Sequence, residues 1–159
     1  MSSRAEAFAT GFAAVNDKII ATISARTDEQ WRRPTASEEW TVGVVAHHIA
    51  DVQGAFTRIL ASLAAGETLP PRSSMEVVHQ NNARHAREFA TVGQPETLAE
   101  QRTSGASIVT LLRGLNDEQL DRTAGVFGGH ELSVARVVEY IVIGHAREHL
   151  TSIRATIAE

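Results

Sequence analysis

Two histidines one helical turn apart, His145 and His149, are the clearest candidates for chemistry in this chain of 159 residues. They stand in the stretch GHAREHL near the C-terminus. Successive side chains of an α-helix are rotated by about 100°, so residues four positions apart project from the same side. Two imidazoles placed in this way can bind one divalent metal ion. The alternative is that both are ordinary residues of a C-terminal helix.

The apolar residues before this pair place it on the inner face of the predicted helix. On a helical wheel, Val134, Val138 and Ile141 lie within about 60° of His145. A buried imidazole has two ring nitrogens that need partners, and an unpaired polar group in a core costs about 1–3 kcal/mol. We therefore expect a metal ion or a hydrogen-bonding group at these nitrogens.

A third histidine, His48, faces the interior in the same way. It shares its side of a predicted helix with Val44, Val52 and Ile59, whereas the adjacent His47 points about 100° away, toward the helix flank. Three neutral imidazoles are a sufficient protein ligand set for Zn²⁺ or a similar ion, with a fourth position left open. A core histidine bonded to a backbone carbonyl is the other interpretation of each residue.

The position of Glu148 offers a second interpretation of the same stretch. His145-x-x-Glu148-His149 fits the H-x-x-E-H pattern of inverted zinc proteases. We disfavour a protease because that site needs a distant carboxylate ligand and room for an extended peptide. Glu148 lies about 60° from His145, where it can support a ligand or pair with a cation in solvent.

Weaker candidates lie on a more polar predicted helix. Asn82 and His85 share a face with apolar residues and can line a pocket beside the metal or merely edge the core. With Glu148 they are the weak catalytic candidates. We expect His130 to be solvated, and Asp51 either to orient a ligand ring or to face water.

The periodicity of apolar residues predicts helices that position these side chains. They cover residues 4–25, 41–65, 74–90, 96–115 and from Ser133 to near the C-terminus. Capped turns are predicted at 27–30 and 116–123, and the glycine-containing stretch 124–132 is predicted as a loop. No persuasive strand pair appears, so the sequence predicts one all-α domain over residues 1–159.

One internal similarity supports this layout. TDEQWRRPTASEEWTVGVV at 27–45 resembles NDEQLDRTAGVFGGHELSVARVV at 116–138, and both read as a capped turn, a loop and a long helix. The similarity indicates two alike helix beginnings around a shared centre, or only the recurrence of common capping residues.

Composition narrows the function classes. The chain has no cysteine, which excludes disulfides and a cysteine nucleophile, so any reacting thiol must arrive as a cosubstrate. A net charge of −4 with both signs interspersed gives no support for binding nucleic acid or a membrane surface. No apolar run reaches the length of a signal peptide or membrane span, so we expect a cytoplasmic protein. We expect its substrate to be a small molecule.

Three segments together resemble the DinB/YfiT-like superfamily, which includes the metal-binding domain of mycothiol-dependent maleylpyruvate isomerases. They are WTVGVVAHHIAD at 40–51, NDEQLDRT at 116–123 and IGHAREHLTSI at 143–153. The resemblance implies a four-helix bundle, with short extra helical turns, and a metal held by His48, His145 and His149. It also implies a homodimer.

The predicted function follows from the site and this resemblance. We expect a metal-dependent enzyme with zinc or nickel, acting as a thiol-dependent S-transferase or isomerase on a small electrophile, because a divalent cation stabilises a thiolate. Hydrolysis by metal-activated water is the first alternative. The second is a non-enzymatic, DinB-like stress protein that binds a metal or small molecule.

Overall fold

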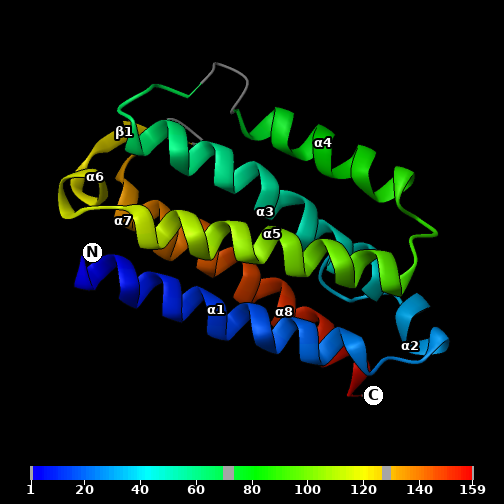
Figure 1. Cartoon of the computed structure of the whole chain (residues 1–159). Coiled ribbons are helices and arrows are strands. Elements are labelled where there is room, and N and C mark those ends of the chain that lie inside the picture. The colour runs from blue at the N-terminus through cyan, green and yellow to red at the C-terminus, as the bar shows by residue number, and fades with distance from the viewer. Residues whose placement is uncertain (1, 70–73, 127–129, 159) are drawn as a thin grey trace.

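Four long helices form the body of the molecule in the computed structural model, which describes residues 2–69, 74–126 and 130–158 (Figure 1). They are α1 (Ser3–Ser24), α3 (Val42–Ala64), α5 (Gln94–Gly114) and a C-terminal helix that ends in α8 (Gly144–Ile157). Both α1 and α3 pack against α5 and against α8. The predicted all-α class and four-helix bundle are confirmed.

Aliphatic side chains fill the centre of this bundle. Ile19, Leu60, Ile108 and Ile153, one from each long helix, are fully buried. Each comes from an apolar stripe of helical period, so the four stripes meet along the bundle axis. Helix α5 begins two residues before the predicted position 96, because Pro95 sits in its first turn, where a missing N–H costs nothing.

The two similar segments fold alike. Thr27 with Gln30 and Asn116 with Gln119 form capping boxes that open the short helices α2 (Asp28–Arg32) and α6 (Asp117–Asp121). In each segment the first N–H of the following long helix donates to a carbonyl just after the short helix: Val42 to Arg33 over 3.0 Å and Val134 to Arg122 over 2.9 Å. The internal similarity therefore reflects a shared local structure.

A short strand pair lies where the sequence predicted only a loop. Strand β1 (Thr123–Gly125) pairs antiparallel with β2 (Glu131–Ser133). Three residues per strand give no alternating pattern long enough to recognise, which is why the pair was missed.

The C-terminal helix is not a uniform α-helix. Helix α7 (Val134–Arg136) leads into a π-helical segment, Val137–Ile143, before α8 begins. A π-helical turn holds more residues, so a wheel drawn at 100° per residue drifts across it. Ile141, expected on the inward face, is accordingly only half-buried, whereas Val142 is buried.

Helix α4 (Met75–Glu88) lies outside the four-helix body and runs beside α3 (Figure 1). Its only buried residue is His85. Across the described residues, no helix has both the length and the apolar character that crossing a membrane would require.

Candidate metal centre

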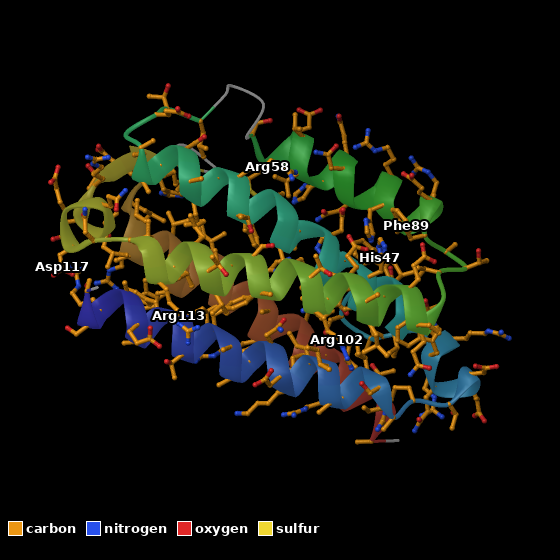
Figure 2. All side chains as sticks on the ribbon, in the orientation of Figure 1. His47, Arg58, Phe89, Arg102, Arg113 and Asp117 are labelled. Carbon is orange, nitrogen blue, oxygen red and sulfur yellow. The ribbon has the colours of Figure 1, made fainter. Side chains whose placement is uncertain are left out.

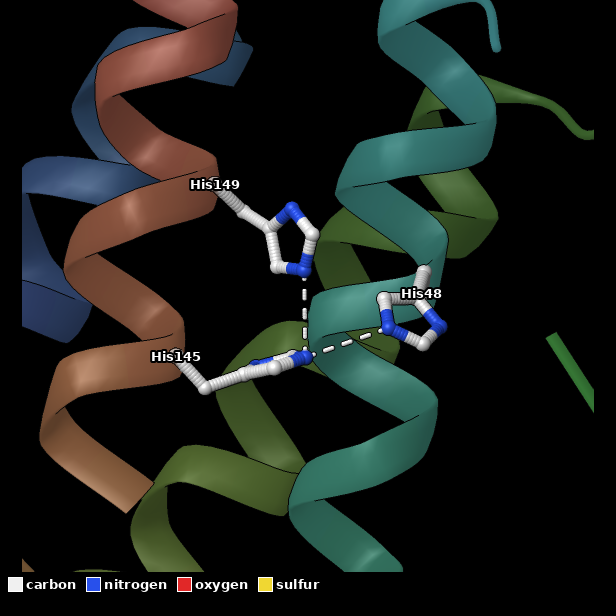
Figure 3. Close-up of side chains that lie close together, drawn as sticks. All are labelled: His48, His145 and His149. Atoms are coloured by element: carbon white, nitrogen blue, oxygen red, sulfur yellow. Dashed lines mark hydrogen bonds between the residues drawn. The ribbon is translucent and has the colours of Figure 1, made fainter. Parts of the chain in front are cut away.

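The ring nitrogens of His48, His145 and His149 converge between α3 and α8. Nε2 of His145 lies 3.1 Å from Nε2 of His48 and 3.1 Å from Nε2 of His149. One ligand atom from each ring lies within 4.8 Å of the other two. Figure 3 shows His48 reaching across from α3 toward the two rings on α8. Residues about one hundred positions apart thus form one cluster.

Local structure sets the direction of these three side chains. Thr41 caps α3 by accepting from the N–H of Val44, which places His48 two turns into the helix, on its buried face. His145 and His149 follow the π-helical segment and occupy the first turns of α8. The π-helical segment therefore helps to decide the angle at which the pair meets His48.

Glu38 holds the outer nitrogen of His149, a contact that the sequence did not predict. Nδ1 of His149 donates to Oε1 of Glu38 over 2.8 Å, and the Ser152 hydroxyl donates to Oε2 over 2.5 Å. Both side chains of the His149–Glu38 pair are nearly enclosed, at 14% and 12% exposure. A carboxylate behind a ligand histidine fixes which ring nitrogen carries the proton and how the ring is turned.

The charge state of Glu38 suits this role. Burial of its carboxyl opposes ionisation, but hydrogen bonds from Ser152, Thr35 and His149 outweigh this and lower the pKa of Glu38 below its ordinary value. An ionised carboxylate only accepts hydrogen bonds, so Nδ1 of His149 must be the protonated nitrogen. In the neutral ring, the lone pair is then on Nε2, which faces the cluster.

Burial favours the neutral form of the other two imidazoles. Burial, reinforced by the neighbouring imidazoles, lowers the pKa of His48 to about 3 and that of His145 to about 2. Neutral imidazole is the form that binds a metal. In a tetrahedral site with Zn–N bonds of about 2.0–2.1 Å, neighbouring nitrogens stand about 3.3–3.4 Å apart, close to the 3.1 Å that separates Nε2 of His145 from Nε2 of His48 and of His149. The cluster therefore fits a divalent ion such as Zn²⁺.

His47 enters a second histidine cluster, beside the first. It is buried, because α4 and α5 cover the flank to which the helical wheel assigned it. Its Nδ1 lies 3.3 Å from Nε2 of His85, and its Nε2 lies 3.0 Å from the Glu100 carboxylate. Phe89 stacks on its ring at 3.9 Å between centroids, where α3 meets the end of α4 (Figure 2). Asp51 pairs with His85 at 3.4 Å rather than with His48.

A cavity of about 1020 Å³ opens directly above the three histidines. It lies between α3, α4, the β1–β2 pair and the C-terminal helix. Asn82 and Glu148 line it, as do His79 and the exposed His130. His85 is turned away into the second cluster, so of the three weak catalytic candidates only Asn82 and Glu148 face the cavity.

Comparison with known proteins identifies the family. The family described as mycothiol maleylpyruvate isomerase N-terminal domain matches residues 12–145. The chain belongs to this family. It is a DinB/YfiT-like protein, as the three sequence segments indicated. The comparison with curated proteins gave no match.

Solved structures share the fold at low sequence identity. YfiT from Bacillus subtilis, described as a probable metal-dependent hydrolase with an unusual four-helix bundle topology, is 19% identical with a TM-score of 0.79, over 98% of this chain and 87% of that chain. Mycothiol-dependent maleylpyruvate isomerase is 13% identical with a TM-score of 0.76, over 96% of this chain. The chain spans only 63% of the isomerase's length.

Proposed function

We propose that this protein is a metal-dependent transferase that joins a low-molecular-weight thiol to a small electrophile. His48, His145 and His149 would hold the ion, with zinc or nickel as the expected metals. The observation that carries the proposal is the position of the three nitrogens, which converge at the floor of a cavity large enough for two small reactants. The isomerase relative supports thiol chemistry, since it is named as mycothiol-dependent.

Each group in the proposed site has a defined task. A bound divalent cation would lower the pKa of a thiol or water, because it stabilises the deprotonated form. The chain supplies no thiol of its own, since it has no cysteine. Glu38 orients His149, and Asn82, which lines the cavity, would orient the electrophile.

Hydrolysis is the second candidate from the same site. YfiT is described as a probable metal-dependent hydrolase, and Glu148 lines the cavity, where its carboxylate can accept a proton from water. The two candidates differ in whether a thiol or water attacks, so only the transferase requires a thiol cosubstrate.

Metal analysis followed by a thiol assay tests the proposal. Protein purified without chelator should contain about one divalent ion per chain, His145→Ala should lose it, and His79→Ala, which removes an exposed histidine outside the cluster, should keep it. The loaded protein should then accelerate conjugation of an aryl chloride with mycothiol or glutathione. Ester cleavage without conjugation would favour the hydrolase, and absence of metal from fresh protein would contradict both enzymes.

A further inference from the structure

We propose that the cavity above the histidine cluster selects an uncharged, largely apolar electrophile and discriminates against anionic ones. The inference rests on the proposed function and names its substrate class. A preference for uncharged substrates would distinguish this chain from enzymes that act on a dicarboxylate.

Apolar side chains make up most of the cavity wall. Helix α3 contributes Val52, Phe56 and Ile59, helix α4 contributes Val78, and the C-terminal helix contributes Ile141. These side chains lie on both sides of the space above the three nitrogens. A ligand gains affinity there by removing apolar surface from water, and a charged group would lose hydration without a partner.

The charged groups of the cavity are all acidic among the described residues that line it. Glu131 and Glu148 contribute carboxylates, and none of those lining residues is a lysine or arginine. Anion sites in proteins are normally built from such cations or from helix N-termini. The N-terminus of α4 borders the cavity, but the N–H groups of Val77 and Val78 there already donate to Ser74. This wall therefore repels a carboxylate on the substrate.

The metal would not reverse this preference once a thiol is present. A divalent cation brings two positive charges, which the Glu38 carboxylate beside His149 and the anionic sulfur of a thiol offset. Glu131 and Glu148 are then the remaining charged side chains that a second ligand meets among the described residues lining the cavity.

Asn82 supplies a neutral polar contact for such a substrate. It is half-buried on the cavity face of α4 and lines the same space as the three histidines. Its amide has both donors and an acceptor, so it suits a nitro, carbonyl or amide group without demanding charge. With 1-chloro-2,4-dinitrobenzene as substrate, the sulfur forms a bond to the chlorinated carbon, chloride leaves with the bonding electrons, and the thiol proton passes to solvent.

Binding of two fluorescent probes tests the inference without any reaction. N-phenyl-1-naphthylamine and 8-anilinonaphthalene-1-sulfonate differ by one sulfonate. In the presence of glutathione, the metal-loaded protein should bind the neutral probe at least about tenfold more tightly, because like charges oppose the anion. Ala55→Trp places a large ring in the cavity and should weaken binding of the neutral probe, whereas Ala106→Trp, on the exposed face of α5, should not. Equal or tighter binding of the sulfonate, or no cavity binding, would overturn the inference.

Charge reversal gives a second, independent readout. Glu148→Lys should narrow the difference between the two probes by at least about fivefold, because it replaces a repelling charge by an attracting one. Glu139→Lys makes the same change at an exposed position on the C-terminal helix outside the cavity lining and should leave the difference unchanged. An unchanged difference in Glu148→Lys would contradict the role given to this carboxylate.

Kinetics separate failure of this inference from failure of the proposed function. The loaded protein is assayed with 2-chloro-1,3-dinitrobenzene and 4-chloro-3,5-dinitrobenzoate, which differ by one carboxylate, each relative to its uncatalysed rate with the same thiol. Acceleration of the neutral compound alone supports both proposals. Equal acceleration of both compounds keeps the transferase and overturns the selectivity, whereas acceleration of neither contradicts the transferase.

Discussion

Glu38 fixes the orientation of one imidazole of the proposed metal centre, that of His149. It receives hydrogen bonds from His149 and Ser152 and so connects the loop before α3 to α8. The residue that follows, Glu39, has a φ of 61°, in the left-handed region that few side chains adopt. A backbone held in this conformation beside Glu38 indicates that the loop is constrained by the contacts around it.

Glu38→Gln should weaken metal binding without removing a ligand. Loss of a carboxylate behind a ligand histidine typically costs about 10–100-fold in metal affinity. Competition with a chromophoric chelator would measure the change, and Glu29→Gln, an exposed carboxylate in α2, is the matched control. An unaltered zinc affinity in Glu38→Gln would show that this contact does not support the site.

Gly105 shows how closely the bundle is packed at one crossing. A Cβ at this position would lie 2.4 Å from Nδ2 of Asn16, a buried side chain that accepts a 2.7 Å hydrogen bond from Gln101. Gly105→Ala should therefore reduce the free energy of unfolding by about 1–3 kcal/mol. Gly54→Ala, also within a helix but with only the Arg58 side chain near the new Cβ, at an ordinary contact distance of 3.8 Å, should instead raise it by about 0.5–1 kcal/mol through helix propensity. Urea denaturation would measure whether the free energy of unfolding falls in Gly105→Ala and rises in Gly54→Ala.

At the scale of elements, α4 is the part of the cavity wall least fixed to the bundle. It forms one side of the cavity, yet His85 is its only buried residue. His85 reaches His47 and Asp51 on α3, and Phe89, just after α4, stacks on His47. The second histidine cluster therefore serves to anchor α4 over the metal centre.

His85→Ala should loosen α4 more than the rest of the molecule. It removes two polar contacts of about 0.5–1.5 kcal/mol each, so opening of α4 should increase by at least about fivefold. Hydrogen exchange measured by mass spectrometry would report this in peptides of α4, with those of α1 and α5 nearly unchanged. Arg84→Ala, at an exposed position of the same helix, serves as the control. Uniformly faster exchange across all helices would argue for a global role of His85 instead.

For the molecule as a whole, a bound ion would connect α3 to α8 across the bundle. Without it, the Nε2 atoms of three imidazoles face one another in a partly enclosed space. A ligand that binds only the folded state stabilises it by about 2.7 kcal/mol at 100 times its Kd. For a chain of this size that corresponds to a rise in Tm of about 5–10 °C.

Thermal unfolding with and without metal measures how much a bound ion stabilises the folded state. Zinc or nickel should raise the Tm of the chelator-treated protein and of His79→Ala, and should leave His145→Ala unchanged. An equal rise in His145→Ala would place the stabilising ion elsewhere on the molecule.

The residues by themselves determined the helical class, the approximate helix bounds and the inward direction of His48, His145 and His149. These features follow from helical periodicity and capping, which act over three to four residues and can be recognised in a single segment. The four-helix arrangement came from the resemblance to a family and was confirmed by the fold. The π-helical segment and the three-residue strands escaped prediction because neither leaves a periodic signal.

Only the tertiary structure decided which side chains meet. His47 and His48 are neighbours in sequence, yet one turns under α4 toward His85 and the other turns toward α8. Glu38 reaches His149 across 111 positions, and no local pattern records such a contact. The acidic, apolar character of the cavity likewise arises from four separate elements. Local interactions choose the face of a helix, but the partner on that face depends on how the helices pack together.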